Sequence, residues 1–309
     1  MLLKKALPLV CKWVMIFLIV SLIAFFIPRL MPDNPAESML DAHQMETTKE
    51  NIEKLEEAWG LNKPLYVQYG TWMVNFLHGD WGKSLSTHLD IRDAFLKRLP
   101  YSLTIGLGGL TLSAICSFFL GFGAALKERG LFDLLTRILS LLSLSVPSFV
   151  TTVIIVYFIG VRFKLVKFFT GNSHWNLIIA ILLIALYAVG PMARVVKAHF
   201  KEQMIAPYVT FAISRGFPLR TVLLRHTYKP VLCGLIAVLI SRTPIVFGGS
   251  AILEFALGIP GINFFLVECM HATDYYVLQS YIIVMIICMF VIHVIFNLLL
   301  NLLDRREAL

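Results

Sequence analysis

Few residues in this chain have the types and spacing that catalysis requires. No paired carboxylates, Ser-His-Asp set or H-E-x-x-H motif occurs in a plausible setting. Gly82-Lys83-Ser84 resembles the end of a phosphate-binding loop, but that motif needs a glycine where the chain has Leu77. The sequence therefore predicts no catalytic residue, no nucleotide site and no cofactor.

A metal site is not expected either. Cys269, Met270 and His271 are soft ligands of the kind that copper or nickel accepts. Such a cluster does not by itself close a site, so we interpret it as incidental. The cysteines form no C-x-x-C pair and most lie in or beside apolar runs, which favours small hydrophobic residues over a disulfide framework.

The most unusual charged residue is Arg242, near the middle of a long apolar run. An arginine inside a membrane normally faces a bundle interior or an aqueous cavity. Two interpretations stay open: a pathway residue that attracts a carboxylate or an anionic chelate, or a structural arginine bonded to carbonyls freed near Pro244. Ser143 and Thr151 belong to a polar stripe that could line a pathway, although we favour ordinary interhelical contacts.

The composition indicates that membrane helices position these residues. Of the 309 residues, 58% are hydrophobic and 15% are charged, with a mean hydropathy of +0.78. Soluble domains carry about 25% charged residues. In a membrane protein, the net charge of +8 reflects basic cytoplasmic loops rather than nucleic-acid binding.

Six stretches are long enough to cross a bilayer, which takes about 20 helical residues. They are approximately Leu9–Ile27, Tyr101–Leu126, Leu134–Gly160, Asn176–Val196, Val231–Leu253 and Leu278–Leu303. The first lacks a small-x-small cleavage site, so we expect an uncleaved span. We predict one all-α membrane domain over 1–309, with a core bundle over 101–303.

Loop charges orient the spans. Placing the N-terminus inside puts most loop lysines and arginines in the cytoplasm, which favours two cytoplasmic termini. The segment 29–100 then becomes a long outer loop. In it, Thr47-x-x-Glu50 predicts a capping box at the start of a short amphipathic helix, and Gly60 supplies its end.

The inner segment 197–229 is too long and too patterned for a simple turn. Pro207 can start a helix, and Gly216 followed by Pro218 breaks it. A second short helix follows, with three apolar residues on one face: Leu219, Val222 and Leu223. The pattern fits either a plug for a groove on a soluble partner or a helical loop on anionic lipid.

Part of this segment resembles a known motif. Tyr208-Val-Thr-Phe-Ala212-Ile-Ser-Arg215-Gly216-Phe-Pro-Leu-Arg-Thr-Val-Leu-Leu-Arg225-His226 is similar to the EAA coupling loop of ABC-importer permeases. More specifically, the chain resembles the dipeptide/oligopeptide/nickel permease family over nearly its whole length. Other fitting runs are Gly60 to Tyr69, Gly79 to Ser84, Leu99-Pro100, Val146 to Phe149, and Gly248 to Glu254 leading into Ile259-Pro-Gly261.

Two positions depart from the family pattern. Where the family usually has Ala-Arg-Ala-Lys-Gly, the chain has Ala212-Ile-Ser-Arg-Gly216, which loses the first basic residue. Asn263 stands where a second glycine is frequent, and asparagine tolerates a left-handed turn. By resemblance, six residues couple to an ATPase: Tyr208, Ala212, Arg215, Gly216, Arg225 and His226.

The resemblance implies a multi-pass permease subunit of an ATP-driven importer in the bacterial cytoplasmic (inner) membrane, and not an enzyme. It implies a second homologous permease, two cytoplasmic ATP-binding subunits and an extracytoplasmic solute-binding protein as partners. It also implies alternating access, for which Pro147, Pro191 and Pro244 are candidate kinks. Short peptides are the first expected substrate, and nickel or a metal-chelate complex is the second.

Two other classes stay open. An ion-coupled secondary transporter would use midplane charges and often internal repeats, whereas this sequence has one midplane arginine and no repeat. A membrane scaffold that does not transport would give no reason for the patterned segment 197–229.

Overall fold

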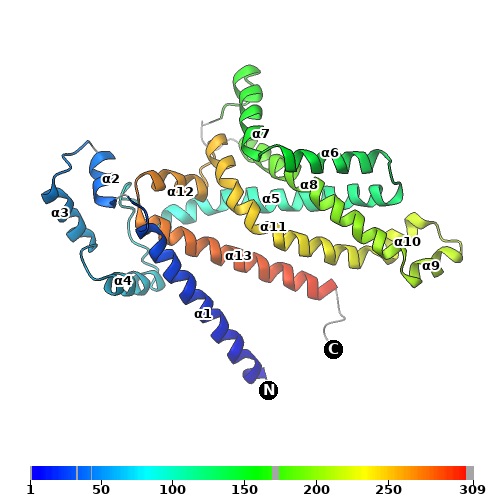
Figure 1. Cartoon of the computed structure of the whole chain (residues 1–309), viewed down its shortest axis with the longest axis horizontal. Helices are drawn as coiled ribbons and strands as arrows, with labels where there is room; N and C mark the ends of the chain where they lie inside the picture. Colours follow the sequence, from blue (N-terminus) through cyan, green and yellow to red (C-terminus); the bar gives the residue numbers. More distant parts are fainter. Residues whose placement is uncertain (1, 33, 43, 169–173, 304–309) are drawn as a thin grey trace. The chain divides into compact units, whose positions relative to one another are not determined.

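The computed structural model describes residues 2–32, 34–42, 44–168 and 174–303, and these parts of the chain contain helices and no β-strand (Figure 1). The helices are α1 (Leu2–Arg29), α2 (Pro35–Ala42), α3 (Lys49–Trp59), α4 (Leu65–Leu77), α5 (Ile91–Leu126), α6 (Leu131–Ser145), α7 (Ser148–Ile155), η1 (Val156–Arg162), α8 (His174–Met204), α9 (Pro207–Ser214), α10 (Leu219–His226), α11 (Tyr228–Leu257), α12 (Ile262–His271) and α13 (Tyr275–Leu303). The chain divides into two compact units. The first holds Met1–Leu99 and Phe265–Cys288, and the second holds Pro100–Phe264 and Met289–Leu309.

An aromatic cluster forms the core of the first unit. Trp72, Met73 and Phe76 share one face of α4 because they are spaced by a helical turn, and all three are buried. They pack with Phe25 of α1, whose ring centroid lies 6.1 Å from that of Trp72. Ser21 and Tyr69 add a hydrogen bond of 2.8 Å between α1 and α4. Apolar and aromatic packing therefore ties the outer segment to the first helix.

The predicted amphipathic helix is α3, but its first cap lies one residue later than the sequence suggested. The side chain of Thr48, not Thr47, accepts a hydrogen bond from the backbone N–H of Asn51. Thr47 instead donates to a carboxylate oxygen of Asp41 at 2.8 Å, which removes it from the capping position. Gly60 ends the helix as predicted, in the left-handed conformation with φ 69°.

The second unit is built around α8. This helix packs against α6, α7 and α11, and α6 and α8 run side by side in Figure 1. Small residues make the contact close: a Cβ atom added to Gly190 of α8 would collide with the backbone of Leu139 and Ser140 in α6. At this point two backbones touch with no side chain between them, which fixes the distance between α6 and α8.

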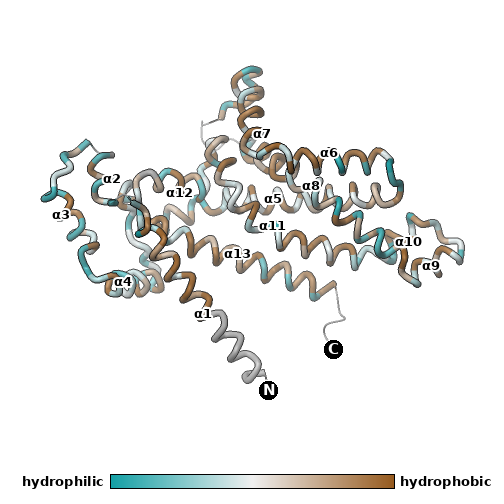
Figure 2. Tube along the Cα trace, in the orientation of Figure 1, coloured by the Kyte–Doolittle hydropathy of each residue, from teal (hydrophilic) through white to brown (hydrophobic). Residues whose placement is uncertain are grey.

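Hydropathy supports a membrane location. Four helices of the described chain are long and apolar enough to cross a bilayer, namely α5, α8, α11 and α13. Helix α6 and the helix Ser148–Arg162 form a bent pair. If this pair is counted as one span, the number of membrane-capable spans rises to five. Figure 2 shows hydrophobic residues along these helices and hydrophilic ones along α3. The first predicted span lies in α1, where Met15–Arg29 forms an apolar helix that is shorter than the four above. That α1 crosses the membrane stays a prediction.

The third predicted span, over 134–160, is broken in the structure at Pro147, one of its candidate kinks. The chain bends by 99° between Ser145 and Ser148. Val146 is extended, with φ −111° and ψ 119°, because a residue before proline is pushed away from the helical region. Pro147 then starts α7 instead of continuing α6. This proline was one of the three candidate kinks, and it breaks its helix, whereas Pro191 and Pro244 lie within continuous helices.

Candidate functional site

The segment α9–α10 forms a compact hairpin of two short helices at one end of α8 and α11 (Figure 1). Pro207 is the first residue of α9, as predicted. Gly216 lies in the bend after α9 and has φ +87°, a backbone conformation that residues with a side chain rarely adopt. A Cβ atom at Gly216 would meet nothing within 4 Å, so backbone conformation and not space explains this glycine.

A fully buried base anchors the hairpin. Val209 of α9 and Val222 and Leu223 of α10 are each 0% exposed, and both helices pack against α8. Of the predicted apolar face of α10, Val222 and Leu223 are thus buried and Leu219 is half-buried, while Arg220 is exposed. Apolar burial of this kind holds a short helix in a fixed orientation. The hairpin is therefore attached to α8 as a rigid projection.

The opposite face of the hairpin is exposed and partly aromatic. Phe211 is 62% exposed, and Phe217, in the bend between the two helices, is 52% exposed. Arg215 lies over the Phe211 ring, 5.3 Å from its centroid. Exposed aromatic residues beside arginine are typical of the central residues of protein interfaces. Sequence reasoning missed Phe211, although its position between Tyr208 and Ala212 placed it within the resemblance.

The six predicted coupling residues are distributed over this hairpin. Tyr208 is exposed and its hydroxyl donates to the side-chain oxygen of Gln203, and Ala212 is half-buried. Arg225 and His226 are exposed in the last turn of α10. The positive charge of Arg225 at that end complements the partial negative charge of the helix C-terminus.

A cavity of about 340 Å³ lies between α6, α7, α8 and α11. Arg242 and Ser143 both line it, so the structure brings these two predicted pathway residues together. Ser143 also donates to the carbonyl of Ser140, as expected for a serine within a helix. Arg242 has no acidic partner in the part of the chain that the structure describes. The cavity is thus lined by apolar residues and hydroxyl side chains, and Arg242 is the one charged residue among those that line it.

Thr151, the third predicted pathway residue, is not among the residues that line this cavity. Its hydroxyl is hydrogen-bonded to that of Tyr187, which does line the cavity. Tyr187 also donates to the carbonyl of Pro147, at the break between α6 and α7. Sequence reasoning missed Tyr187 because a tyrosine in an apolar run gives no signal of the direction in which it points. The structure therefore gives Thr151 a positioning contact.

A second cavity, of about 480 Å³, lies between α6 and α8 nearer to the hairpin. Asp133 is buried there, and it accepts hydrogen bonds from Lys197 at 2.8 Å and from Arg137 at 2.7 Å. Beside it, Lys201 pairs with Glu128 at 2.8 Å, and this hydrogen bond lowers the pKa of the Glu128 carboxyl. The walls of the cavity are rich in basic side chains.

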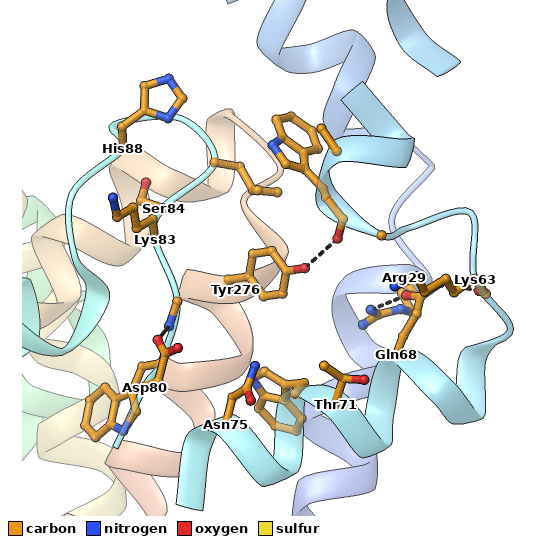
Figure 3. Close-up of a pocket in the computed structure, with 17 residues that line it drawn as sticks. Arg29, Lys63, Gln68, Thr71, Asn75, Asp80, Lys83, Ser84, His88 and Tyr276 are labelled. Carbon is orange, nitrogen blue, oxygen red and sulfur yellow. Dashed lines mark hydrogen bonds between the residues drawn. The ribbon is translucent and has the colours of Figure 1, made fainter. Parts of the chain in front are cut away.

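The first unit contains a polar cavity of about 440 Å³, shown in Figure 3. Arg29 donates to the side-chain oxygen of Gln68 at 2.8 Å and stacks on the Phe25 ring at 3.5 Å. Tyr276 points into the cavity, and its hydroxyl donates to the carbonyl of Trp59 at 3.0 Å. Hydrogen bonds between separate elements thus hold the cavity open.

A buried carboxylate organises the turn between α11 and α12. Glu254 is 0% exposed and accepts hydrogen bonds from the backbone N–H groups of Asn263 and Phe264, at 2.9 and 3.1 Å. The side-chain amide of Asn263 donates to its other oxygen at 2.7 Å. Glu254 therefore orients the following loop, and Asn263 contributes a side chain that glycine would lack.

The helical architecture, the membrane-capable spans and the projecting hairpin define a membrane permease. Family models confirm this class. The model described as "Binding-protein-dependent transport system inner membrane component" matches residues 117–308, and the model of the N-terminal part of the same membrane component matches residues 2–106. The chain therefore belongs to this family, whose members are the permease subunits of ABC importers and are not themselves catalytic.

Individual relatives are similar over nearly their whole length. A Brucella suis protein provisionally named a peptide transport system permease protein is 27% identical over 305 residues, which covers 96% of each chain. The nickel import system permease protein of Staphylococcus aureus is 26% identical over 306 residues, covering 99% of this chain and 92% of its own. The dipeptide transport system permease protein of Lactococcus lactis is 26% identical over 295 residues, covering 95% of each.

Proposed function

We propose that this chain forms half of the translocation pathway of an ATP-driven importer in the bacterial cytoplasmic membrane. Residues 1–309 act as one permease domain with both termini in the cytoplasm, six spans and an outer loop over 29–100. The observation that carries this proposal is the α9–α10 hairpin. A buried base and an exposed aromatic surface are what a lever needs in order to receive force from a separate chain.

The hairpin would transmit motion through α8 and α11. Two cytoplasmic ATP-binding subunits would grip the exposed surface around Phe211 and move it when ATP closes their interface. Val209 and Val222 are buried against their surroundings, so the movement passes to α8 without loss in the hairpin. The break at Pro147 and the prolines within α8 and α11 supply points where the bundle can change between two packings.

The remaining partners complete the pathway. A second, homologous permease would cover the exposed apolar surface of α7, where Val153 is 59% exposed. An extracytoplasmic solute-binding protein would dock on the first unit, and the polar cavity of Figure 3 offers it a concave contact that hydrogen bonds already hold in shape.

Short peptides are the proposed substrate, and nickel or a metal-chelate complex is the second candidate. Relatives named for peptide and dipeptide transport favour the first, and the relative named for nickel import favours the second. An uptake assay with labelled dipeptides and with nickel, in cells that lack this chain, decides between them. Restoration of dipeptide uptake alone by the wild-type gene supports the first candidate.

The hairpin can be tested by purification from native membranes. Tagged wild-type protein is expected to elute with chains that hydrolyse ATP, whereas a deletion of 208–216 and the variant Phe211→Glu elute without ATPase activity. Phe211→Glu places a charge on a surface that contact with a partner would desolvate, which costs several kcal/mol, about a hundredfold or more in affinity. The measured quantity is ATPase activity per mole of tagged chain.

The matched control is Leu131→Glu. Leu131 is 69% exposed and begins α6, so it receives the same charge outside the hairpin. We expect this variant to retain the ATPase activity. If the deletion elutes with full ATPase activity, or if Leu131→Glu loses it to the same extent, the coupling role of α9–α10 is wrong.

A further inference from the structure

The polar cavity of the first unit contains a half-buried arginine that no carboxylate neutralises. Arg29 lines this cavity and donates to the carbonyl of Phe25 at 2.7 Å and to the side-chain oxygen of Gln68 at 2.8 Å. No ion pair joins it to an acidic residue in the ranges that the structure describes. A guanidinium has five N–H donors, so these two bonds leave three for another acceptor.

A buried indole N–H in the same cavity also lacks an acceptor. Trp72 lines the cavity and is 6% exposed, and its Nε1 atom has no hydrogen-bond partner within the described chain. A buried tryptophan N–H usually finds a partner, because an unpaired buried donor costs free energy. Contacts with Phe25 and Phe76 explain where the ring lies, but they do not satisfy its N–H.

The ring of Phe25 brings these two donors close to each other. The guanidinium carbon of Arg29 lies 3.5 Å from the centroid of this ring, and the centroid of Trp72 lies 6.1 Å from it. Both side chains also line one cavity. A ligand only a few bonds long can therefore accept hydrogen bonds from both.

Two other polar side chains of the cavity are already paired within the protein. The amide nitrogen of Gln68 donates to two backbone carbonyls, and its oxygen accepts from Arg29. The hydroxyl of Tyr276 donates to the carbonyl of Trp59 at 3.0 Å. The groups that remain for a ligand near Arg29 are hydrogen-bond donors, which suit a ligand that carries acceptors.

The charged residues of the cavity favour an anion. Arg29, Lys63 and Lys83 are cationic, whereas Asp80 is the one acidic residue among those that line it. Asp80 is exposed and accepts from the backbone N–H of Gly82 at 3.0 Å. Figure 3 shows Asp80 on the side of the cavity away from Arg29 and Lys63. The side that holds Arg29 is therefore the positive one.

We propose that this cavity binds a small ligand through a carboxylate group, with Arg29 as the opposite charge and the Trp72 indole N–H as a second donor. A guanidinium with free donors matches the two oxygens of a carboxylate. The volume of about 440 Å³ lies within the roughly 300–1,000 Å³ of small-molecule sites. The site is separate from the cavity of Arg242, which belongs to the other unit. It goes beyond the transport function proposed above, because binding there needs neither ATP nor a partner chain.

The indole NMR signals of the purified full-length chain test this site. The chain has five tryptophans, which are labelled at the indole nitrogen, and the signal that Trp72→Phe removes is that of Trp72. Acetate is titrated against acetamide, and alanyl-alanine against alanyl-alanine amide, with sodium chloride at equal ionic strength as the salt control. We expect at least one carboxylate to shift the Trp72 signal and to bind at least about tenfold more tightly than its amide, as for a hydrogen bond to a charged group.

Variants assign this preference to Arg29. Arg29→Gln is expected to weaken binding of the carboxylate at least about tenfold and to leave binding of the amide unchanged, while Arg29→Lys retains part of the preference. The control is Lys97→Gln, which removes a positive charge from an exposed position of the first unit that does not line the cavity. Wild-type positions of the indole signals in each ligand-free variant show that the fold is retained.

Three results would overturn the inference: no carboxylate shifts the Trp72 signal, a carboxylate and its amide bind equally, or Arg29→Gln leaves their ratio unchanged. The first would mean that only solvent reaches the indole N–H. Because no transport is measured, the test is independent of the proposed transport function. Carboxylate binding that depends on Arg29 supports the site even if the assembled importer carries neither peptides nor nickel.

Discussion

Glu254→Ala is expected to lower the free energy of unfolding by about 3 kcal/mol, a large fraction of the total stability of a domain. The carboxylate accepts two backbone hydrogen bonds and one from the Asn263 amide, in a place where no solvent reaches. Its removal leaves buried N–H groups without an acceptor, which costs more than a lost exposed hydrogen bond. Thermal unfolding of the detergent-solubilised chain, followed by size-exclusion chromatography, measures the change.

Two variants make the result specific. Glu268→Ala removes a carboxylate that is exposed on α12, and we expect a change of less than about 0.5 kcal/mol. The double variant of Glu254 and Asn263 to alanine is expected to be less destabilised than the sum of the single variants by about 1 kcal/mol, because both remove the same hydrogen bond. Strict additivity would show that the hydrogen bond between the Asn263 amide and the Glu254 carboxylate contributes nothing to stability.

The second prediction is that Gly190→Ala lowers the free energy of unfolding by about 2 kcal/mol. An alanine in a helix interior is ordinarily favoured over glycine by about 1 kcal/mol. Here the added methyl group meets the backbone of Leu139 and Ser140, and no side-chain rotation can relieve that collision. The two helices must therefore separate at this point.

Gly248→Ala is the matched control for this prediction. Gly248 lies in α11, and a Cβ atom there meets nothing within 4 Å, so the substitution gains helix propensity without a collision. We expect it to leave the unfolding temperature unchanged or to raise it. The same unfolding assay compares the two alanine variants. Gly190→Ala would contradict the close α6–α8 contact if it proved as stable as Gly248→Ala.

The sequence alone determined the helical membrane class and the location of the α9–α10 hairpin. Local signals carry both features: long apolar runs set the spans, and Pro207, Gly216 and Pro218 delimit two short helices. Such signals act over one or two helical turns, so no knowledge of the rest of the fold is required to interpret them. The resemblance to one permease family, which the family models confirm, narrowed the helical membrane class to a single family.

Only the tertiary structure decided which residues meet. The cap of α3 moved from Thr47 to Thr48 because Asp41, six residues earlier, binds Thr47. The same holds for the pathway candidates, since Thr151 contacts Tyr187 instead of lining the cavity. Nothing in the order of residues distinguishes a side chain that lines a cavity from one that supports its wall.

The cavity that contains Arg242 shows the same limit. Ser143 and Arg242 are 99 residues apart in the sequence and lie on different helices, so their meeting depends on how α6, α8 and α11 pack. That packing depends on Gly190, whose small size is visible in the sequence but whose neighbour, the backbone of Ser140, is not. Apolar runs and helix breakers act locally and can be recognised in a single chain, whereas cavities and unpaired charges arise between helices and exist only once the helices have packed.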